Sequence, residues 1–375
     1  MSNHPEELSS LRWNSGRGLV EIIDQTALPH DLRWVALDSL DAYCHAISAM
    51  QVRGAPLIGV TAAFGLAQAL AEDASDFALR SAYAALLATR PTAVNLRWAL
   101  DQVSDAVRDL AGSERAAIAH SKALALREAD IKSCASIGDH GLGLLRDRGK
   151  GDVINVLTHC NAGWLATVQW GTALAPVYKA HAQGLPVHVW VSETRPRNQG
   201  MFLTAWELQR AGVPCTLVAD NSCGQLISDG KVDCVIVGSD RTAANGDVCN
   251  KVGTYLKALA AQAHDVPFYV ALPASTIDWK CTSGADIPIE QRDTNELLHA
   301  EGLDNQGVAR SVRMAGPAVV AHNPAFDVTP AQLVTALITD RGTVEASSAG
   351  LADLQQRMKK EAGAATAAAS QAGVA

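Results

Sequence analysis

Residues 153–158 read VINVLT, and the same kind of short apolar run returns as VHVWV at 187–191, CTLVA at 215–219 and VDCVIVG at 232–238. Segments with helical spacing separate these runs, at 164–183, 200–211 and 221–229. Strands that alternate with helices are typical of βαβ units, whose strands form a parallel sheet. Because the runs are apolar almost throughout, both faces of the sheet should be covered. This predicts an α/β fold with a Rossmann-like, doubly wound, mostly parallel sheet, to which FYVAL at 268–272 and AVVAH at 318–322 add strands.

The chain before this stretch has a different pattern. Three short runs, LRWN at 11–14, LVEIID at 19–24 and DLRWVALD at 31–38, predict a small antiparallel sheet. From Ser39 to about Arg148 apolar residues recur at helical spacing, as at Leu96, Leu100, Val103 and Val107. We therefore expect two domains, a mainly helical one with a small sheet at 1–149 and the Rossmann-like one at 150–360.

The C-terminal part carries one further helix signal and a tail. Thr329-Pro330 predicts the start of a last helix, since a hydroxyl group caps a helix well and proline is tolerated at the first helical position. Beyond residue 360, EAGAATAAASQAGVA has no large apolar side chain except Val374. Such a segment buries too little surface to offset the entropy of ordering, so 361–375 are expected to form a disordered, alanine-rich tail.

The composition is that of a soluble globular protein, with 48% hydrophobic and 19% charged residues. A net charge of -8 repels nucleic acid and anionic membranes, and no local basic patch opposes it. The 8 cysteines include no Cys-x-x-Cys pair, and the start MSNHPEELSS does not resemble a secretory signal. Gln68 or Lys179 interrupts the longest apolar runs. We expect a cytoplasmic protein that binds neither nucleic acid nor a membrane.

Candidate catalytic groups lie directly after the predicted strands, because ligands of open parallel sheets bind beyond the carboxyl ends of the strands. Cys160 follows VINVLT, Gln199 lies in the segment after VHVWV, and Asp240 follows VDCVIVG. A thiol with a reference pKa of about 8.5 can transfer protons near neutrality if its surroundings help. From position alone, an inert buried thiol and a helix-capping or ion-paired carboxylate explain Cys160 and Asp240 equally well.

Three segments point to anion binding. In Arg53-Gly54-Ala55-Pro56 the glycine lets the backbone approach a ligand closely, and the helix that begins at the proline has N-terminal amides that favour phosphate. Arg90-Pro91-Thr92 repeats this arrangement before a helix predicted at 93–111, and Asn250-Lys251 offers an amide and a cation. Taken singly, each is explained as readily by surface solvation or helix capping.

Metal and dinucleotide chemistry find no matching motif. There is no His-Glu-x-x-His, and the 11 histidines are scattered. THCNAG stands where the Gly-x-Gly-x-x-Gly turn of a dinucleotide enzyme would follow the first parallel strand. We therefore expect no metal and no cofactor.

Five motifs in a fixed order connect this chain to a known family. They are RGAPLIGV at 53–60, RPTAVNL at 90–96, THCNAG at 158–163, SETRPRNQG at 192–200 and GSDRTAANGDVCNKVGTY at 238–255. With them the sequence resembles the methylthioribose-1-phosphate isomerases over nearly the whole chain, except at the two termini. The resemblance implies a homodimer and a role in methionine salvage, within the superfamily of the eukaryotic initiation-factor exchange subunits.

Carried over residue by residue, the resemblance implies a catalytic cysteine at Cys160 and a catalytic aspartate at Asp240. The implied contacts to the substrate are Arg53, Gly54, Ala55, Arg90, Gln199, Asn250 and Lys251. The reaction is the conversion of 5-methylthioribose 1-phosphate to 5-methylthioribulose 1-phosphate. Because the anomeric carbon carries phosphate, the ring must open before hydrogen moves from C2 to C1. We expect Asp240 to protonate the ring oxygen and Cys160 to assist the transfer, either as a thiolate base or by polarising a hydride path.

Two residues depart from the family pattern. Ser192 stands where an aspartate is usual, and Trp164 stands where a smaller residue is expected, so that an indole near the pocket would change its volume. These departures leave isomerases of 5-deoxyribose 1-phosphate and of ribose 1,5-bisphosphate as alternatives. Another alternative is a non-catalytic sugar-phosphate-binding subunit of the initiation-factor exchanger type. The presence of both Cys160 and Asp240 speaks against it.

Overall fold

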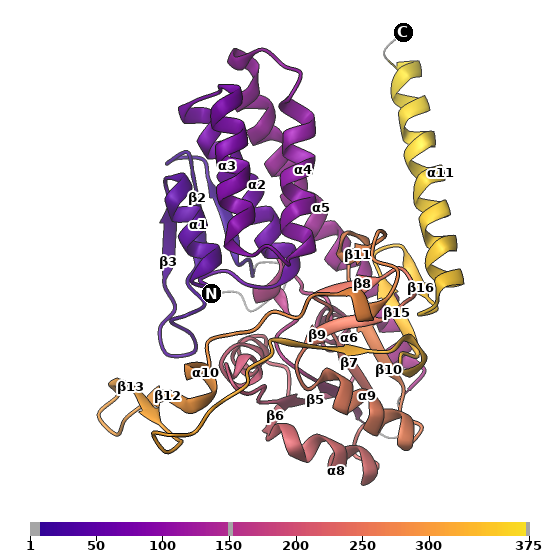
Figure 1. The fold of residues 1–375 in the computed structure, drawn as a ribbon. Coiled ribbons are helices and arrows are strands. Elements are labelled where there is room, and N and C mark those ends of the chain that lie inside the picture. Colours follow the sequence, from indigo (N-terminus) through magenta and orange to yellow (C-terminus); the bar gives the residue numbers. More distant parts are fainter. Residues whose placement is uncertain (1–7, 149–152, 373–375) are drawn as a thin grey trace.

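The computed structural model describes residues 8–148 and 153–372. A helical N-terminal half is stacked on a C-terminal half built around one large sheet (Figure 1). The chain opens with an antiparallel sheet in the order β1-β2-β3. Its strands lie at Leu11–Asn14, Leu19–Ile23 and Trp34–Leu37, which confirms the small antiparallel sheet expected from the sequence.

Five helices complete the N-terminal half. They are α1 (Leu40–Ser48), α2 (Ala55–Glu72), α3 (Asp76–Thr89), α4 (Val94–Val107) and α5 (Gly112–Arg146). Helix α2 is long and apolar enough to cross a membrane by composition alone, but 78% of it is buried inside the protein. The other four helices pack around it, which makes α2 the core of this half. The apolar pattern Leu96, Leu100, Val103 and Val107 is the buried face of α4.

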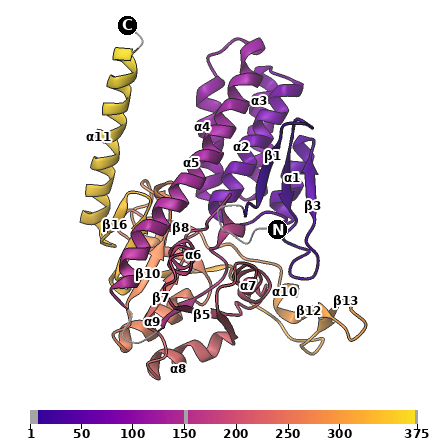
Figure 2. The ribbon, with the colours of Figure 1, turned by 180° about the vertical axis from the view of Figure 1, so that it is seen from behind.

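Helix α5 belongs to both halves (Figure 2). It packs on α2 and α4 in the N-terminal half, and on α6 (Ala175–Ala182) and strand β15 (Ala336–Thr339) in the C-terminal half. The expected domain boundary between residues 149 and 150 lies outside the described residues. A single helix of 35 residues therefore forms part of both packed bodies.

The large sheet has seven strands in the order β16-β15-β10-β7-β4-β5-β6. All neighbouring strands are parallel except β15 and β16. The strands are β4 (Ile154–Thr158), β5 (Val187–Ser192), β6 (Cys215–Val218), β7 (Cys234–Val237), β10 (Phe268–Ala271), β15 (Ala336–Thr339) and β16 (Gly342–Val344). The chain runs outward from β4 to β6 on one side and from β7 to β15 on the other. The topological switch point therefore lies between β4 and β7, and the Rossmann-like prediction is confirmed.

Both faces of this sheet are covered, as the continuous apolar strands predict. On one face Val156 and Ile236 pack with α6 and with α7 (Ala205–Arg210). On the other face Leu157 and Val235 pack with α8 (Cys223–Ser228) and α9 (Thr254–Ala263). Successive side chains of a strand point to opposite faces, so adjacent apolar residues serve two separate cores.

A second sheet, which was not predicted, has the order β11-β8-β9-β14. Its strands are β8 (Arg241–Ala243), β9 (Val248–Lys251), β11 (Ile277–Asp278) and β14 (Phe326–Thr329). Between β11 and β14 the chain forms the short helix α10 (Asn295–Leu298) and a projecting hairpin of β12 (His299–Leu303) and β13 (Ala309–Arg313) (Figure 1).

Three predictions of secondary structure before residue 348 were wrong. AVVAH at 318–322 forms no strand; it is irregular, and Val320 is 94% exposed, so a run of apolar residues was mistaken for a buried one. Thr329-Pro330 is followed by a single 3-10 turn, η7 (Ala331–Leu333), because the chain then enters β15 beside β10. The expected helix at 164–183 is divided into the turn η2 (Trp164–Ala166) and α6, with a loop between them.

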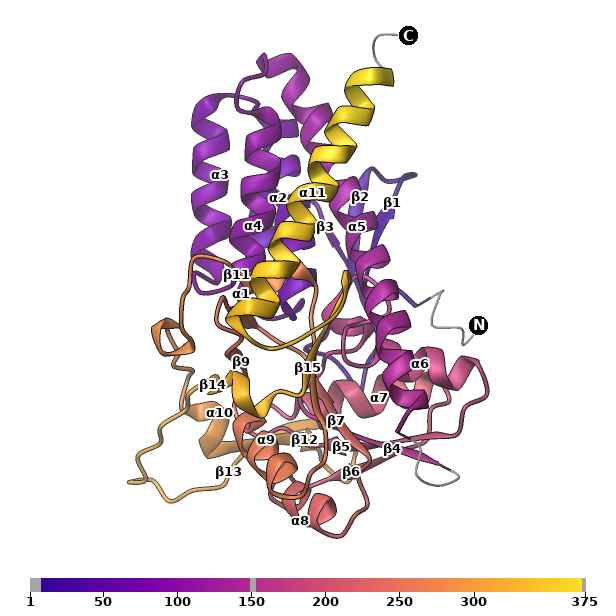
Figure 3. The ribbon, with the colours of Figure 1, turned by 90° about the vertical axis from the view of Figure 1, so that its right-hand side faces the viewer.

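The C-terminal segment also differs from its prediction. Helix α11 (Ser348–Ala372) continues through most of the segment expected to be disordered, and residues 373–375 lie outside the described residues. Alanine has the highest helix propensity, so an alanine-rich segment can continue a helix that is already nucleated. Figures 1 and 3 show α11 leading away from β16 toward the end of the molecule where α3 begins and α4 ends.

Candidate active site

Cys160 and Asp240 lie at the switch point of the large sheet, just beyond the ends of β4 and β7. Both side chains line a cleft whose empty space, including its open mouth, is about 780 Å³. Both also line an adjoining smaller cavity, so the two residues face common space. Of the other predicted site residues, the cleft is lined by Arg53, Gly54, Ala55, Arg90, Gln199 and Lys251, and the smaller cavity by Asn250. The structure therefore brings all nine together.

The N-terminus of α2 forms one wall of the cleft through Gly54 and Ala55. Gly54 has φ 92, a conformation that residues with a side chain rarely adopt. A Cβ atom on Gly54 would lie 2.3 Å from the carbonyl oxygen of Ala166. Glycine is thus required both by the backbone conformation and by the close approach to Ala166, and this approach places the N-terminus of α2 at the wall of the cleft.

Arg53 is held in place by a chain of buried polar groups. Its guanidinium donates to the Oδ1 and, at 2.8 Å, to the carbonyl oxygen of Asn161. The Nδ2 of Asn161 donates in turn to Glu207, whose other carboxyl oxygen accepts from the Leu165 amide at 3.2 Å. Burial raises the pKa of Glu207 to about 8, although these donors oppose the shift. An amide rather than a carboxylate contacts Arg53 directly, so its charge stays available to an anion.

Arg90 lies before the N-terminus of α4, which also opens toward the cleft. Its Nη2 is 3.1 Å from Glu290, and this pair continues through Arg292 and Glu296 to Arg197. Burial opposes ionisation of Glu290, but Arg90 and Arg292 still hold its pKa below the usual value. Arg197 and Arg292 line the cleft and were not predicted as site residues, although SETRPRNQG and IPIEQRD contain them.

Gln199 and the β9 residues complete the site. Gln199 precedes a π-helical turn, η3 (Gly200–Thr204), a feature frequent at functional sites. Its buried Oε1 accepts no hydrogen bond from any residue that the structure describes. Along β9, Asn250 faces the smaller cavity and Lys251 faces the cleft, as expected for successive residues of a strand. Burial lowers the pKa of Lys251, while Cys160 and Asp240 counteract the shift.

The backbone of Cys160 is strained and tightly held. Its φ of 63 is uncommon for a residue with a side chain, and such strain persists only where the surroundings impose it. The amide of Cys160 donates to Thr194 Oγ1 at 2.8 Å, and its carbonyl accepts from Thr204 Oγ1 at 2.7 Å. Burial raises the pKa of the thiol, against the pull of Arg53 and Lys251. The neutral thiol is therefore favoured in the free protein.

Burial also raises the pKa of Asp240, against the positive charges of Lys251, Arg53 and Arg90. A carboxyl group that holds its proton longer than usual suits a general acid. Asp240 and Cys160 are thus two groups with raised pKa values beside two cations. Arg90, Arg197, Arg241 and Arg292 are paired with carboxylates, whereas Arg53 and Lys251 form no ion pair with any residue in 8–148 and 153–372.

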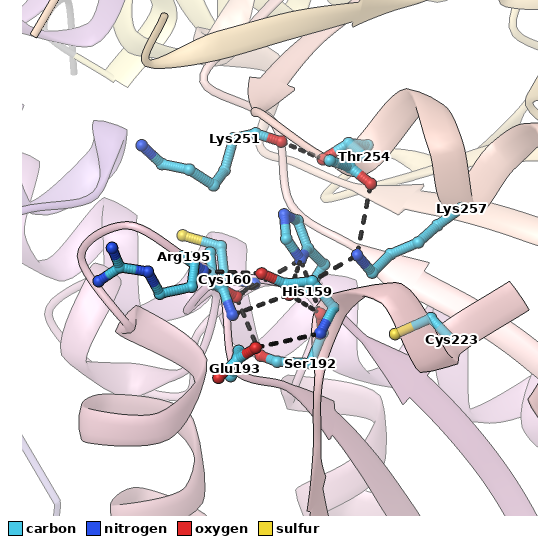
Figure 4. Close-up of polar contacts among 12 residues, drawn as sticks. His159, Cys160, Ser192, Glu193, Arg195, Cys223, Lys251, Thr254 and Lys257 are labelled. Atoms are coloured by element: carbon cyan, nitrogen blue, oxygen red, sulfur yellow. Dashed lines mark hydrogen bonds and ion pairs between the residues drawn. The ribbon is translucent and has the colours of Figure 1, made fainter. Parts of the chain in front are cut away.

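The two departures from the family pattern lie outside the cleft. Trp164 is 1% exposed and packs against Trp206 with ring centroids 5.9 Å apart, so it does not set the volume of the pocket as expected. Ser192 is fully buried at the end of β5, where it contacts His159 (Figure 4) and donates to Asp220 instead. Neither side chain lines the cleft or the smaller cavity. Among the described residues no group of three or more His, Cys, Asp or Glu side chains is arranged to hold a metal ion.

Comparisons with known proteins show the family of this chain. The sequence model of the initiation factor 2 subunit family matches residues 51–346. The methylthioribose-1-phosphate isomerase of Dechloromonas aromatica is 58% identical over 344 residues, which cover 91% of this chain and 95% of that protein.

Two solved structures are similar over most of the chain. The 5-methylthioribose 1-phosphate isomerase of Pyrococcus horikoshii OT3 has a TM-score of 0.81 and 36% identity, and the match covers 95% of this chain and 99% of that chain. The delta subunit of translation initiation factor eIF-2B from A. fulgidus has a TM-score of 0.75 and 39% identity, with 90% and 96% covered.

Proposed function

The chain belongs to the methylthioribose-1-phosphate isomerases, within the initiation factor 2 subunit family, and we propose that it converts 5-methylthioribose 1-phosphate to 5-methylthioribulose 1-phosphate. The observation that carries this proposal is that Cys160 and Asp240 face common space beside the unpaired cations Arg53 and Lys251. This aldose–ketose isomerisation is the reaction that methionine salvage requires of the family.

The phosphate group would bind where the free positive charge lies. Arg53, the N-terminal amides of α2 at Gly54 and Ala55, and Lys251 offer charge and donors to a dianion. Arg90 and Asn250 would add contacts from neighbouring walls, and the free Oε1 of Gln199 would accept from a sugar hydroxyl. Holding the phosphate fixes C1 and C2 relative to the two catalytic groups, which lowers the entropic part of the barrier.

The chemical roles follow from the two raised pKa values. Asp240 would protonate the ring oxygen as the furanose opens. Cys160 would then assist the movement of hydrogen from C2 to C1. Two routes are open: deprotonation by a Cys160 thiolate, or a direct hydride shift beside the neutral thiol. The raised pKa of Cys160 favours the second route in the free enzyme.

The apolar part of the cleft supports the methylthio substrate over a bisphosphate. Met50, Ile58, Ile287, Pro288 and Phe326 line it, and they suit a thioether or a methyl group. A second phosphate placed against this wall would lose its hydration without compensation. 5-Deoxyribose 1-phosphate differs less from 5-methylthioribose 1-phosphate, since it lacks only the methylthio group. It is therefore the closer alternative substrate.

The test is a turnover assay of the purified protein, without added metal or nucleotide, against three substrates. These are 5-methylthioribose 1-phosphate, 5-deoxyribose 1-phosphate and ribose 1,5-bisphosphate. We expect the highest kcat/KM with the methylthio sugar. Binding of all three without any turnover would instead support a non-catalytic subunit of the initiation-factor type; the A. fulgidus relative is named as an initiation-factor subunit.

Running the same reaction in deuterated water separates the two hydrogen-transfer routes. An enediol intermediate can exchange its proton with solvent, so deuterium at C1 of the ketose indicates the thiolate route. A direct hydride shift carries the hydrogen across unexchanged and leaves no deuterium at C1.

We further propose that the enzyme is a cytoplasmic homodimer. The family resemblance supports the dimer. The eight cysteines are all free thiols in the structure, a state that the reducing cytosol maintains. Sedimentation of the purified protein would test the dimer, with a monomer as the contrary result.

A further inference from the structure

The backbone of Cys160 is held by the side chains of two threonines. Its amide donates to Thr194 Oγ1 at 2.8 Å, and its carbonyl oxygen accepts from Thr204 Oγ1 at 2.7 Å. Among the residues that the structure describes, neither the amide nor the carbonyl of Cys160 forms a hydrogen bond with another backbone group. Cys160 also lies beyond Thr158, the last paired residue of β4, so the sheet does not hold it. Two hydroxyl groups therefore fix this part of the backbone.

This support matters because the conformation of Cys160 is unfavourable by itself. Its φ of 63 lies in the left-handed region, which residues with a Cβ atom seldom adopt. Such a conformation persists only where the surrounding structure imposes it. The thiol of Cys160 shares two cavities with Asp240, and a change of φ would move the thiol relative to that carboxyl group. The groups that hold the Cys160 backbone therefore also hold the spacing of the two side chains.

The hydrogen bonds of Thr204 can be assigned completely. A carbonyl oxygen only accepts, so the single hydroxyl hydrogen of Thr204 goes to the Cys160 carbonyl. Thr204 Oγ1 also lies 3.1 Å from Asn161 Nδ2 and accepts from it. The side-chain amide of Asn161 cannot be reversed, because its Oδ1 faces the guanidinium of Arg53, which has only donors. Every donor in this group thus meets an acceptor.

Thr204 is well placed to hold another residue because its own backbone is firmly mounted. It is the last residue of the π-helical turn η3, has ordinary helical angles of φ -65 and ψ -47, and is 1% exposed. Gly200, at the start of this turn, packs so closely on the end of β5 that an added Cβ would overlap the Ser192 carbonyl. Strand β5 pairs with β4, which leads directly to Cys160. The Thr204 hydroxyl is therefore carried by an element that packs on the same sheet.

We propose that Thr204 is a positioning residue for the isomerisation: its hydroxyl holds the Cys160 carbonyl and so keeps the thiol of this left-handed residue in the space that it shares with Asp240. Thr204 lines neither cavity, so it acts through Cys160 and not on the substrate. The inference rests on the proposed function of the cleft.

The arrangement separates this role from phosphate binding. Asn161 donates to Glu207 as well as to Thr204, and it accepts from Arg53 through its backbone carbonyl as well as through Oδ1. Arg53 therefore keeps its support when the Thr204 hydroxyl is removed. The loss of that hydroxyl should affect the chemical step and leave the binding of an anion nearly unchanged.

The experiment compares Thr204→Val, Thr204→Ser and the control Thr158→Val. Valine keeps the shape of threonine without the hydroxyl, whereas serine keeps the hydroxyl without the methyl group. Thr158 is 2% exposed, and its hydroxyl donates to the Ile236 carbonyl at 2.8 Å. It lines neither cavity and does not contact Cys160 through that hydroxyl. The control thus loses a buried hydrogen bond of the same kind at another place.

We expect Thr204→Val to lower kcat about 10- to 100-fold, because small misplacements of reacting groups are costly. The inhibition constant of inorganic phosphate should change less than about threefold, since the Arg53 site stays intact. Thr204→Ser and Thr158→Val should both keep most of the wild-type kcat. A wild-type kcat in Thr204→Val would overturn the proposal. So would losses of kcat as large in either of the other two variants, or a phosphate inhibition constant that rises as far as kcat falls.

A second readout does not depend on turnover. Brief alkylation with iodoacetamide, followed by mass spectrometry, reports the reactivity of each cysteine separately. Cys160 is 8% exposed in the cleft, and Cys234 in β7 is 0% exposed. In Thr204→Val the Cys160 thiol should react at least about threefold faster than in the wild type, because its segment opens locally, while Cys234 keeps its rate. An unchanged rate at Cys160, or an equal increase at both cysteines, would contradict the proposal.

Thr204→Ala replaces the valine variant in both measurements if Thr204→Val does not fold, because alanine places no methyl group against the Cys160 carbonyl. The same results are expected from it. The two proposals fail in different ways. A wild-type protein without turnover on any of the three sugars contradicts the proposed function, while the alkylation rates still decide the role of Thr204. Normal turnover of the wild type with unchanged kcat and alkylation in Thr204→Val contradicts only the role of Thr204.

Discussion

Cys160 and Asp240 follow the neighbouring strands β4 and β7, one on each side of the point where the strand order reverses, and both open into the same two cavities. A thiol and a carboxyl group far apart in the sequence thereby meet at the place where open sheets bind ligands. The catalytic roles assigned to them can be tested one at a time.

Asp240→Asn and Cys160→Ser should each lower kcat by at least about 10², the usual contribution of a general acid or base. Both replacements are close in size to the original side chain, so thermal melting should stay near the wild type. Turnover within a fewfold of the wild type would remove that residue from the mechanism. Cys223→Ser provides a matched control, because Cys223 is a buried cysteine that lines neither cavity.

Arg53→Met should weaken phosphate binding, since it removes a cation without an ion-pair partner among the described residues. A hydrogen bond to a charged group contributes about 1.5 to 3 kcal/mol, which corresponds to roughly 10- to 150-fold in affinity. Competitive inhibition by inorganic phosphate measures this loss without any turnover of the variant. Arg357→Met, on the exposed face of α11, should leave the inhibition constant unchanged.

Gly54→Ala should damage both stability and activity. Its new Cβ would clash with the Ala166 carbonyl, and its φ of 92 would be strained. Gly18→Ala is the matched control, because Gly18 has φ 66 but no atom within 4 Å of the added Cβ. We expect a loss of about 1 kcal/mol for Gly18→Ala from the backbone alone and a clearly larger loss for Gly54→Ala. Equal melting temperatures of the two variants would show that the residues around Gly54 shift easily to accommodate the added Cβ.

The stability of the Glu207→Gln variant relative to the wild type should increase as the pH rises. The buried Glu207 has a pKa of about 8, above its value in the unfolded chain, so the folded state binds its proton more tightly. In the wild type the stability that comes from this protonated carboxyl group is fully present below about pH 4.5. It falls between about pH 4.5 and 8 and is absent above that range. Glutamine cannot ionise. The free energy of unfolding of the variant relative to the wild type should therefore be higher at pH 9 than at pH 5, measured by urea unfolding; no difference would refute the raised pKa.

The large sheet and its switch point were predictable because parallel strands buried on both faces are apolar almost throughout, as VDCVIVG and VINVLT are. The same signal failed at AVVAH, since four successive apolar residues do not reveal whether a neighbouring strand exists. Thr329-Pro330 failed for a related reason: a good local start for a helix was overridden by the pairing of β15 with β10. Local signals decide secondary structure only where tertiary contacts agree with them.

The candidate site was predictable in part. Strand ends and glycine-proline segments led to Cys160, Asp240 and Gly54 as candidates, and the family resemblance named their roles. Nothing local in the sequence distinguishes Arg197 or Arg292 from other surface arginines, because their position in the cleft depends on an ion-pair network that only the folded chain assembles. Conversely, Trp164 drew attention by its size, yet it fills the core.

The alternating arginines and glutamates from Arg90 to Arg197 join a segment before α4, the stretch between β11 and β14, and the loop after β5. Three remote portions of the chain are thereby braced against one another around the rim of the cleft before any sugar arrives. Much of the ordering that a ligand would otherwise have to impose has already taken place when the polypeptide folds. Replacing Arg292, which lies in the middle of this network, should therefore loosen the whole rim of the cleft and not only the segment that carries Arg292.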